Sequence, residues 1–238
     1  MSTAVVSGGT KGIGLRLSLR LASLGHRVVA LYHSDSSAAA AASAEGLVTM
    51  RVDVGDPDAV AVAAETIVAE HGAPTVLVNN AGLNVDRPFL EMSTSDWKRV
   101  LDTNLSGAFY LTRALVPAMD TGCVVNIGAT TGIRPRRNGA NYCASKAGLL
   151  QLTKCLALEL APRIRVNCLI PGNTETDEVI ERFGLTDPAT RARFLADVPL
   201  GRTGDPDEIA DALEFLVGDR SAFLTGQKLI VDGGQFMW

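Results

Sequence analysis

The stretch TAVVSGGTKGIG, residues 3–14, passes from small and β-branched apolar residues into a turn that is rich in glycine. Residues 15–25, LRLSLRLASLG, then place leucines at helical spacing and end on a glycine. A glycine-rich turn between a strand and a helix lets the backbone approach a pyrophosphate, and the helix N-terminus supplies free N–H groups. The stretch therefore predicts the first strand–turn–helix unit of a dinucleotide-binding sheet, with a ligand-free tight turn as the alternative.

The same alternation of strand and helix continues along the chain. Further apolar, β-rich runs occupy residues 26–32, 47–53, 74–80, 122–128, 163–170 and 228–233. These runs are continuously apolar, as expected for parallel strands that are covered by helices on both faces. We predict an α/β fold of one domain over residues 1–238, a doubly wound, Rossmann-like parallel sheet of about seven strands. The irregular segment at about 173–202 is predicted to be a lid-like insertion.

Composition excludes several classes of function. The 238 residues are 47% hydrophobic and 20% charged with a net charge of −4, which is globular and gives no reason to expect nucleic acid. We expect no membrane span and no signal peptide, and hence a cytoplasmic protein. We expect no metal site, because the histidines are scattered and the cysteines lack ligand spacing. The cysteines, predicted to be buried, are Cys123, Cys143, Cys155 and Cys168.

Several motifs in fixed order indicate a family. The turn has the spacing Gly8-x-x-x-Gly12-x-Gly14, and Tyr142 precedes Lys146 by four residues. Other motifs are NNAG at 79–82, Asn104 within DTNLSGAFYLTRA at 102–114, and PGNTET at 171–176. This set resembles the short-chain dehydrogenase/reductase family over nearly the whole chain. The C-terminal segment 199–238 is similar to that of β-ketoacyl-[acyl-carrier-protein] reductases.

The resemblance implies a nicotinamide cofactor, and the chemistry of the second strand favours NADPH. The tip of that strand is Tyr32, so no carboxylate is expected to repel a 2′-phosphate, which Lys11, His33 and Ser34 can meet. By resemblance, the residues predicted to bind the cofactor are Gly8, Thr10, Lys11, Gly12, Ile13, Gly14, His33, Ser34, Asp53, Val54, Asn80, Ala81, Gly82, Tyr142, Lys146, Pro171, Gly172, Thr174 and Thr176.

The resemblance also implies the chemistry, the reduction of a ketone. Tyr142 would donate the proton, Lys146 would lower the pKa of that phenol, and Asn104 would join through a water-linked proton relay. The substrate implied is a 3-oxoacyl thioester on acyl carrier protein or a related β-keto compound. Without the family, Tyr142 and Lys146 remain two residues on one helix face.

One member of the family's catalytic set is absent. The family has a serine thirteen residues before the tyrosine, and that position here is Ala129. Loss of one such donor typically costs about 2.7–4 kcal/mol, so reduced activity is expected. Thr131, Asn138 and Asn141 are alternative donors, none of them chosen. A second hypothesis is a degenerate member that binds nucleotide and scaffolds an active partner.

The resemblance also suggests the substrate and the protein partners. The lid carries Val179, Ile180, Phe183, Leu185, Phe194 and Leu195, enough apolar surface to cover an acyl chain. Arg134, Arg136 and Arg137 near the expected site mouth could contact an acidic acyl carrier protein. The family usually forms tetramers, so we expect a homotetramer through helices at about 95–119 and 139–160, with a mixed oligomer for the scaffold.

Overall fold

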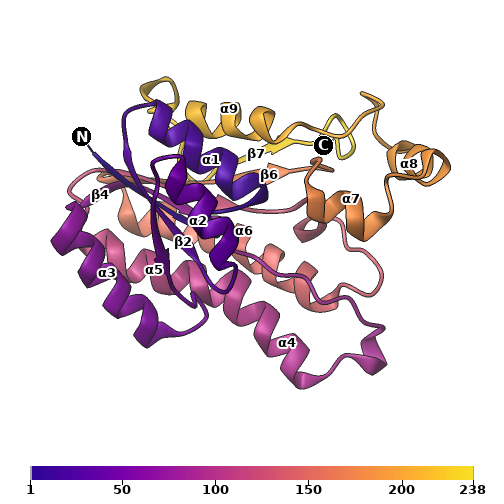
Figure 1. Cartoon of the computed structure of the whole chain (residues 1–238), viewed down its shortest axis with the longest axis horizontal. Helices are drawn as coiled ribbons and strands as arrows, with labels where there is room; N and C mark the ends of the chain where they lie inside the picture. Colours follow the sequence, from indigo (N-terminus) through magenta and orange to yellow (C-terminus); the bar gives the residue numbers. More distant parts are fainter. Residues whose placement is uncertain (1, 238) are drawn as a thin grey trace.

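The computed structural model describes residues 2–237 as a seven-stranded parallel sheet in the order β3-β2-β1-β4-β5-β6-β7 (Figure 1). The strands are β1 (Thr3–Ser7), β2 (Arg27–Tyr32), β3 (Val48–Arg51), β4 (Pro74–Asn79), β5 (Gly122–Ile127), β6 (Ile164–Pro171) and β7 (Lys228–Val231). The order reverses between β1 and β4, and open parallel sheets bind ligands at such a switch point. The predicted fold class is confirmed.

Two layers of helices cover the sheet. The helices are α1 (Gly12–Ser23), α2 (Ser36–Ala44), α3 (Pro57–His71), α4 (Thr94–Leu101), α5 (Gly107–Leu115), α6 (Ala140–Leu160), α7 (Asp177–Phe183), α8 (Pro188–Leu195) and α9 (Pro206–Val217). Buried residues of α1 and α9 form one apolar cluster with one face of the sheet, and those of α3 and α5 form another with the opposite face. Both layers are visible in Figure 1.

Local signals in the sequence explain where the helices begin. Asp56 caps α3 by accepting hydrogen bonds from the backbone N–H groups of Asp58 and Ala59, and Pro57 occupies the first turn. Asp205 and Glu208 form a reciprocal capping box at the start of α9. These caps satisfy N–H groups that have no partner within the helix.

The predicted helix at about 95–119 is interrupted by a wider turn. α4 and α5 are joined through a π-helical turn, Asp102–Ser106, and a short 3₁₀ turn, Val116–Ala118, follows α5. Such π-helical turns are rare and occur frequently at functional sites. The buried residue of this turn is Asn104, one of the predicted catalytic residues.

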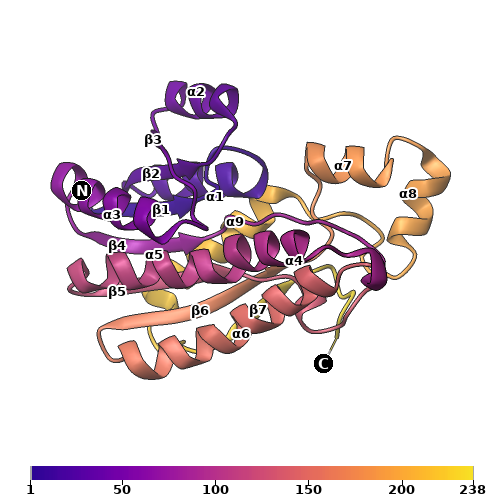
Figure 2. The ribbon, with the colours of Figure 1, turned by 90° about the horizontal axis from the view of Figure 1, so that it is seen from below.

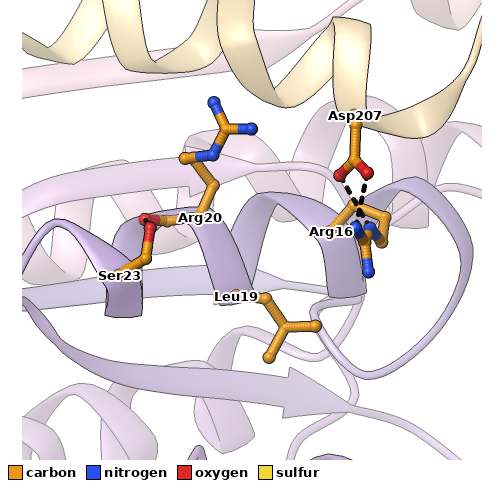
Figure 3. A pocket seen from close by; sticks show the side chains of 5 residues that line it. All are labelled: Arg16, Leu19, Arg20, Ser23 and Asp207. Carbon is orange, nitrogen blue, oxygen red and sulfur yellow. Dashed lines mark hydrogen bonds and ion pairs between the residues drawn. The ribbon is translucent and has the colours of Figure 1, made fainter.

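Ion pairs line a shallow pocket between α1 and α9 (Figure 3). Arg16 forms a fork on Asp207 with distances of 2.5 and 2.8 Å, and Arg20 pairs with Asp211 and Glu214. Each arginine already has a carboxylate, so the pocket offers no free cation. These pairs join the two helices, and the exposed Arg16–Asp207 pair contributes about 0–1 kcal/mol.

Segment 173–202 holds α7 and α8, which lie away from the sheet in Figure 2. Phe183 and Phe194, one from each helix, have ring centroids 5.0 Å apart. Leu185 is buried and therefore anchors the segment, whereas Phe183 remains exposed. No helix of residues 2–237 combines the length and the apolar character that crossing a bilayer requires. Among the cysteines, Cys155 is exposed, which corrects the expectation that all four are buried.

Candidate active site

The glycine-rich turn has a shape that only small residues permit. Gly8 has a φ of +61°, and a Cβ on Gly14 would lie 2.0 Å from the carbonyl oxygen of Gly8. Lys11, at the N-cap of α1, provides no side-chain cap for the first turn of the helix. The N–H groups of that turn are thus left for another acceptor, which is the arrangement that a phosphate requires. The turn fits the pyrophosphate of a dinucleotide.

The segment after β4 is fastened to this turn. The Asn80 amide nitrogen donates to the carbonyl oxygens of Ser7 and Gly8, both at 3.0 Å. Ser7 Oγ in turn accepts from the backbone N–H groups of Asn80 and Ala81, also at 3.0 Å. Asn80 therefore braces the glycine-rich turn. Ser7 was not among the predicted site residues, although its place at the end of the first strand could have indicated it.

The segment after β6 also reaches the turn. A Cβ on Gly12 would lie 3.7 Å from the Thr176 methyl carbon, so α7 begins beside the glycines. Thr176 caps α7 through the backbone N–H of Val179 at 3.3 Å. Pro171, at the end of β6, and Thr174 are buried, and Thr174 Oγ1 donates to the Gly172 carbonyl oxygen at 3.3 Å. PGNTET thus follows β6 and reaches the glycine-rich turn.

The adenosine end of the predicted site contains carboxylates. Lys11 Nζ lies 3.7 Å from Asp35 Oδ2, and His33 Nε2 lies 3.6 Å from Asp53 Oδ2. Tyr32 puts no carboxylate at the strand tip, but Asp35 from the following loop lies close to Lys11. The reason is the cap of α2: Asp35 accepts from the Ala38 N–H and so turns back toward the glycine-rich turn. The charge of Lys11 is therefore already partly neutralised.

A third cation at this end was missed. Arg51 closes β3 directly opposite Tyr32 in the strand register, and its Nε donates to the His33 carbonyl oxygen at 3.0 Å. Arg51 forms no ion pair within the described part of the chain. Its position at the end of the strand beside the β2 tip could have indicated it. It is the cation at this end that remains available for a phosphate.

The three predicted catalytic residues come together beside Gly82. Lys146 Nζ lies 5.8 Å from the centroid of the Tyr142 ring and donates to the Ile127 carbonyl oxygen at 2.8 Å. A Cβ on Gly82 would lie 3.7 Å from Lys146 Nζ and 3.6 Å from Asn104 Oδ1. Tyr142 and Lys146 stand one turn apart on α6, as their spacing requires.

The Asn104 side chain makes three hydrogen bonds, to Leu83 and Ser145. Its oxygen accepts from the Leu83 N–H at 2.8 Å, and its nitrogen donates to the Leu83 carbonyl oxygen at 3.0 Å and to Ser145 Oγ at 3.1 Å. Ser145, also unpredicted, donates to the Tyr142 carbonyl oxygen at 2.8 Å. The amide therefore holds the loop after β4 against α6.

Comparison with known proteins agrees with this geometry. A family profile described as enoyl-(acyl carrier protein) reductase matches residues 8–235. The 3-oxoacyl-[acyl-carrier-protein] reductase FabG of Escherichia coli (strain K12) is 39% identical over 243 residues, which cover 98% of this chain and 97% of that protein. The chain belongs to the short-chain dehydrogenase/reductase family.

Other members of the family are similar over the same length. The acetoacetyl-CoA reductase of Shinella zoogloeoides is 37% identical over 238 residues, which cover 98% of this chain and 98% of that protein. The solved structure of Thermoplasma acidophilum aldohexose dehydrogenase (AldT) superposes with a TM-score of 0.90 at 31% identity, covering 98% of this chain and 93% of that one. The chain is thus an oxidoreductase of this family.

The electrostatics of this family member differ from expectation at the tyrosine. Burial lowers the pKa of Lys146 to about 8, because the ammonium is removed from water. Burial also raises the pKa of Tyr142, against the opposing charges of Arg136 and Arg182. The net pKa of this phenol is therefore raised in the ligand-free protein, because the desolvation of the ring outweighs the nearby cations.

The segment around Ala129 bends directly after β5. Ala129 is extended, and Thr130–Gly132 then form a 3₁₀ turn. Thr131 Oγ1 is buried without a hydrogen-bond partner. The Asn141 side chain is fully buried and engaged with the backbone of Val85 and Tyr142, so it is not a free donor.

One of the three predicted carrier-binding arginines is committed elsewhere. Arg136 forms a fork on Asp86 at 2.6 and 2.8 Å. Arg182 of α7 pairs with the same carboxylate. Arg134 and Arg137 remain exposed, with the Arg134 guanidinium carbon 5.7 Å from the Phe236 ring centroid. Arg136 is therefore not available as a surface contact in this arrangement.

Proposed function

We propose that this family member reduces a ketone with NADPH, and that the ketone is a 3-oxoacyl thioester carried by acyl carrier protein or a related β-keto compound. The observation that carries the proposal is the convergence of Tyr142, Lys146 and Asn104 beside Gly82. The similarity to FabG and to an acetoacetyl-CoA reductase supports the substrate class.

The nicotinamide cofactor, when bound, supplies the hydride. The residues that would hold it are those of the glycine-rich turn, the segment after β4 and PGNTET, whose uncapped N–H groups and open glycine backbone fit a pyrophosphate. Arg51 supports NADPH over NADH. It lies near the β2 tip and forms no ion pair with a carboxylate of the described residues, so its charge can pair with a 2′-phosphate.

Three residues of the chain act in the proton transfer, one as the donor and two in support of it. Tyr142 donates the hydroxyl proton to the developing alkoxide, and the Lys146 ammonium stabilises the phenolate that remains. Asn104 keeps the Leu83 backbone and α6 in register, so that the phenol and the ammonium stay beside the nicotinamide position. Ala129 offers no donor to the carbonyl, and we propose a slower reaction than in members with serine.

The surface supports partners of two kinds. Arg134 and Arg137 are exposed near the site mouth and suit the acidic surface of an acyl carrier protein. Trp97, Phe109 and Leu158 are exposed apolar residues on the helices predicted to form the homotetramer. Both assignments form part of the proposal.

The test is the consumption of NADPH with a 3-oxoacyl thioester as substrate. We expect turnover by the wild-type chain, and a fall in kcat of about 10²–10⁴-fold in Tyr142→Phe with unchanged NADPH binding. Binding of NADPH without turnover on a broad panel of ketones would refute the enzyme and favour the nucleotide-binding scaffold of a mixed oligomer.

A further inference from the structure

Asp86 joins three segments that are distant in the sequence. It lies in the coil that follows β4 and accepts both bonds of the Arg136 fork, from the loop between β5 and α6. It also pairs with Arg182, near the end of α7. A second anchor fixes the fork, since Arg136 Nη2 donates to Asn84 Oδ1 at 3.0 Å. Bidentate guanidinium–carboxylate pairs are geometrically specific, so Arg136 is held in one orientation.

That orientation places Arg136 beside the predicted proton donor. The Arg136 guanidinium carbon lies 5.7 Å from the centroid of the Tyr142 ring, as near as Lys146 Nζ on its own approach at 5.8 Å. The Arg136 side chain is 30% exposed, so its charge is only partly screened by water. A cation at this range from an aromatic ring interacts favourably with the ring and more strongly with a phenolate.

Charged groups of both signs surround Tyr142. Arg136 and Arg182 favour the phenolate, and Glu178 and Cys143 oppose it. Asp86 offsets part of the two positive charges. Burial raises the pKa of the Asp86 carboxyl, but Arg136 and Arg182 outweigh burial and hold that pKa below its usual range. Two guanidinium groups thus share the Asp86 carboxylate beside the phenol.

We propose that Asp86 fixes Arg136 against the ring of Tyr142, and that Arg136 is thereby a positioning residue that stabilises the phenolate left after proton transfer. This rests on the proposed function of Tyr142 as the proton donor. The proton leaves the Tyr142 hydroxyl for the alkoxide oxygen, the electron pair of the O–H bond stays on the phenol oxygen, and the fixed guanidinium lowers the energy of that anion. In a chain with alanine at 129, Arg136 adds a fixed positive charge next to the reacting groups.

The experiment measures the ionisation of Tyr142 directly, without turnover. The chain has three tyrosines, so labelling with 3,5-difluorotyrosine, which ionises at lower pH than tyrosine, gives a short set of ¹⁹F signals. Tyr142→Phe assigns the signal of interest. We expect Arg136→Gln to raise the pKa of the labelled Tyr142 by about half a pH unit or more. We expect Arg136→Lys, which keeps the charge without the fork, to give a smaller rise.

Arg137→Gln is the matched control, because it removes the same charge from the same loop at an exposed residue. An equal shift in both glutamine variants, or none in Arg136→Gln, would overturn the inference. The basic limb of the kcat/KM profile should move with the ionisation of Tyr142. If no ketone is reduced, the proposed function fails while the ¹⁹F titration still decides where Arg136 acts.

Discussion

The Asn104 amide nitrogen lies 3.1 Å from Ser145 Oγ and joins the π-helical turn to the helix that carries Tyr142 and Lys146. Asn104 is 2% exposed, so each hydrogen bond of its side chain replaces one that water would otherwise make. This contact explains how a residue some forty positions earlier in the sequence can control the placement of the tyrosine.

Replacing Asn104 should therefore destabilise the protein more than replacing its partner. Asn104→Ala leaves the N–H and carbonyl of Leu83 unpaired, and we expect a loss of about 2–3 kcal/mol of unfolding free energy. Ser145→Ala removes one of these bonds and should cost about 1 kcal/mol. Urea unfolding of both variants measures the difference. Equal losses would show that the Leu83 contacts contribute nothing.

Lys146 should make stability depend on pH. Its pKa is about 8 when folded and 10.5 ordinarily, so below pH 8 both states are charged and the burial penalty is fully present. Between these values the unfolded chain holds more protons, and stability rises with pH by up to about 3 kcal/mol. Lys146→Met lacks this contribution. Its stability relative to wild type should fall as pH rises from 7 to 10, measured by denaturant unfolding; a constant difference would contradict the depressed pKa.

Ala129→Ser should restore the carbonyl donor. Ala129 is extended and only partly buried, so a hydroxyl can be added without repacking the sheet. We expect kcat/KM for a 3-oxoacyl thioester to rise by about tenfold or more. Ala129→Val, which adds bulk without a donor, is the control. A fall in both variants would show that the site is shaped around alanine.

Arg51 should discriminate between the two nicotinamide cofactors. A charge-assisted hydrogen bond contributes about 1.5–3 kcal/mol, so Arg51→Leu should weaken NADPH binding by about tenfold to a hundredfold. The affinity for NADH, which lacks the 2′-phosphate, should hardly change and serves as the internal control. Titration of intrinsic fluorescence with each cofactor gives both constants. An equal loss for both cofactors would place Arg51 outside the phosphate site.

Thr131→Val should stabilise the ligand-free protein. The threonine hydroxyl is buried without a partner, whereas valine has almost the same shape and nothing to satisfy. We expect a gain of about 1–2 kcal/mol, seen as a higher midpoint in urea. A loss of stability would mean that the hydroxyl has a partner in solution.

Much of the fold was predictable because its signals are local. Apolar runs and the glycine-rich turn act within a few residues, and the structure has strands where the apolar runs predict them. The motif NNAG and the pair Tyr142 and Lys146 were likewise found from short spacings. Two unpredicted residues, Ser7 and Ser145, act through bonds to segments far along the chain.

The sequence by itself determined the doubly wound sheet, because periodicity and glycine spacing are properties of neighbouring residues. The family, and the site residues that it implies, came from the resemblance of several motifs in order along the chain. Only the tertiary structure decided which charged groups lie together. It places carboxylates beside Lys11 and His33 and two arginines on Asp86. It also decided that burial moves the pKa values of Lys146 and Tyr142. Coulomb energies and desolvation depend on distance in space and on access to water, and neither follows from separation along the chain.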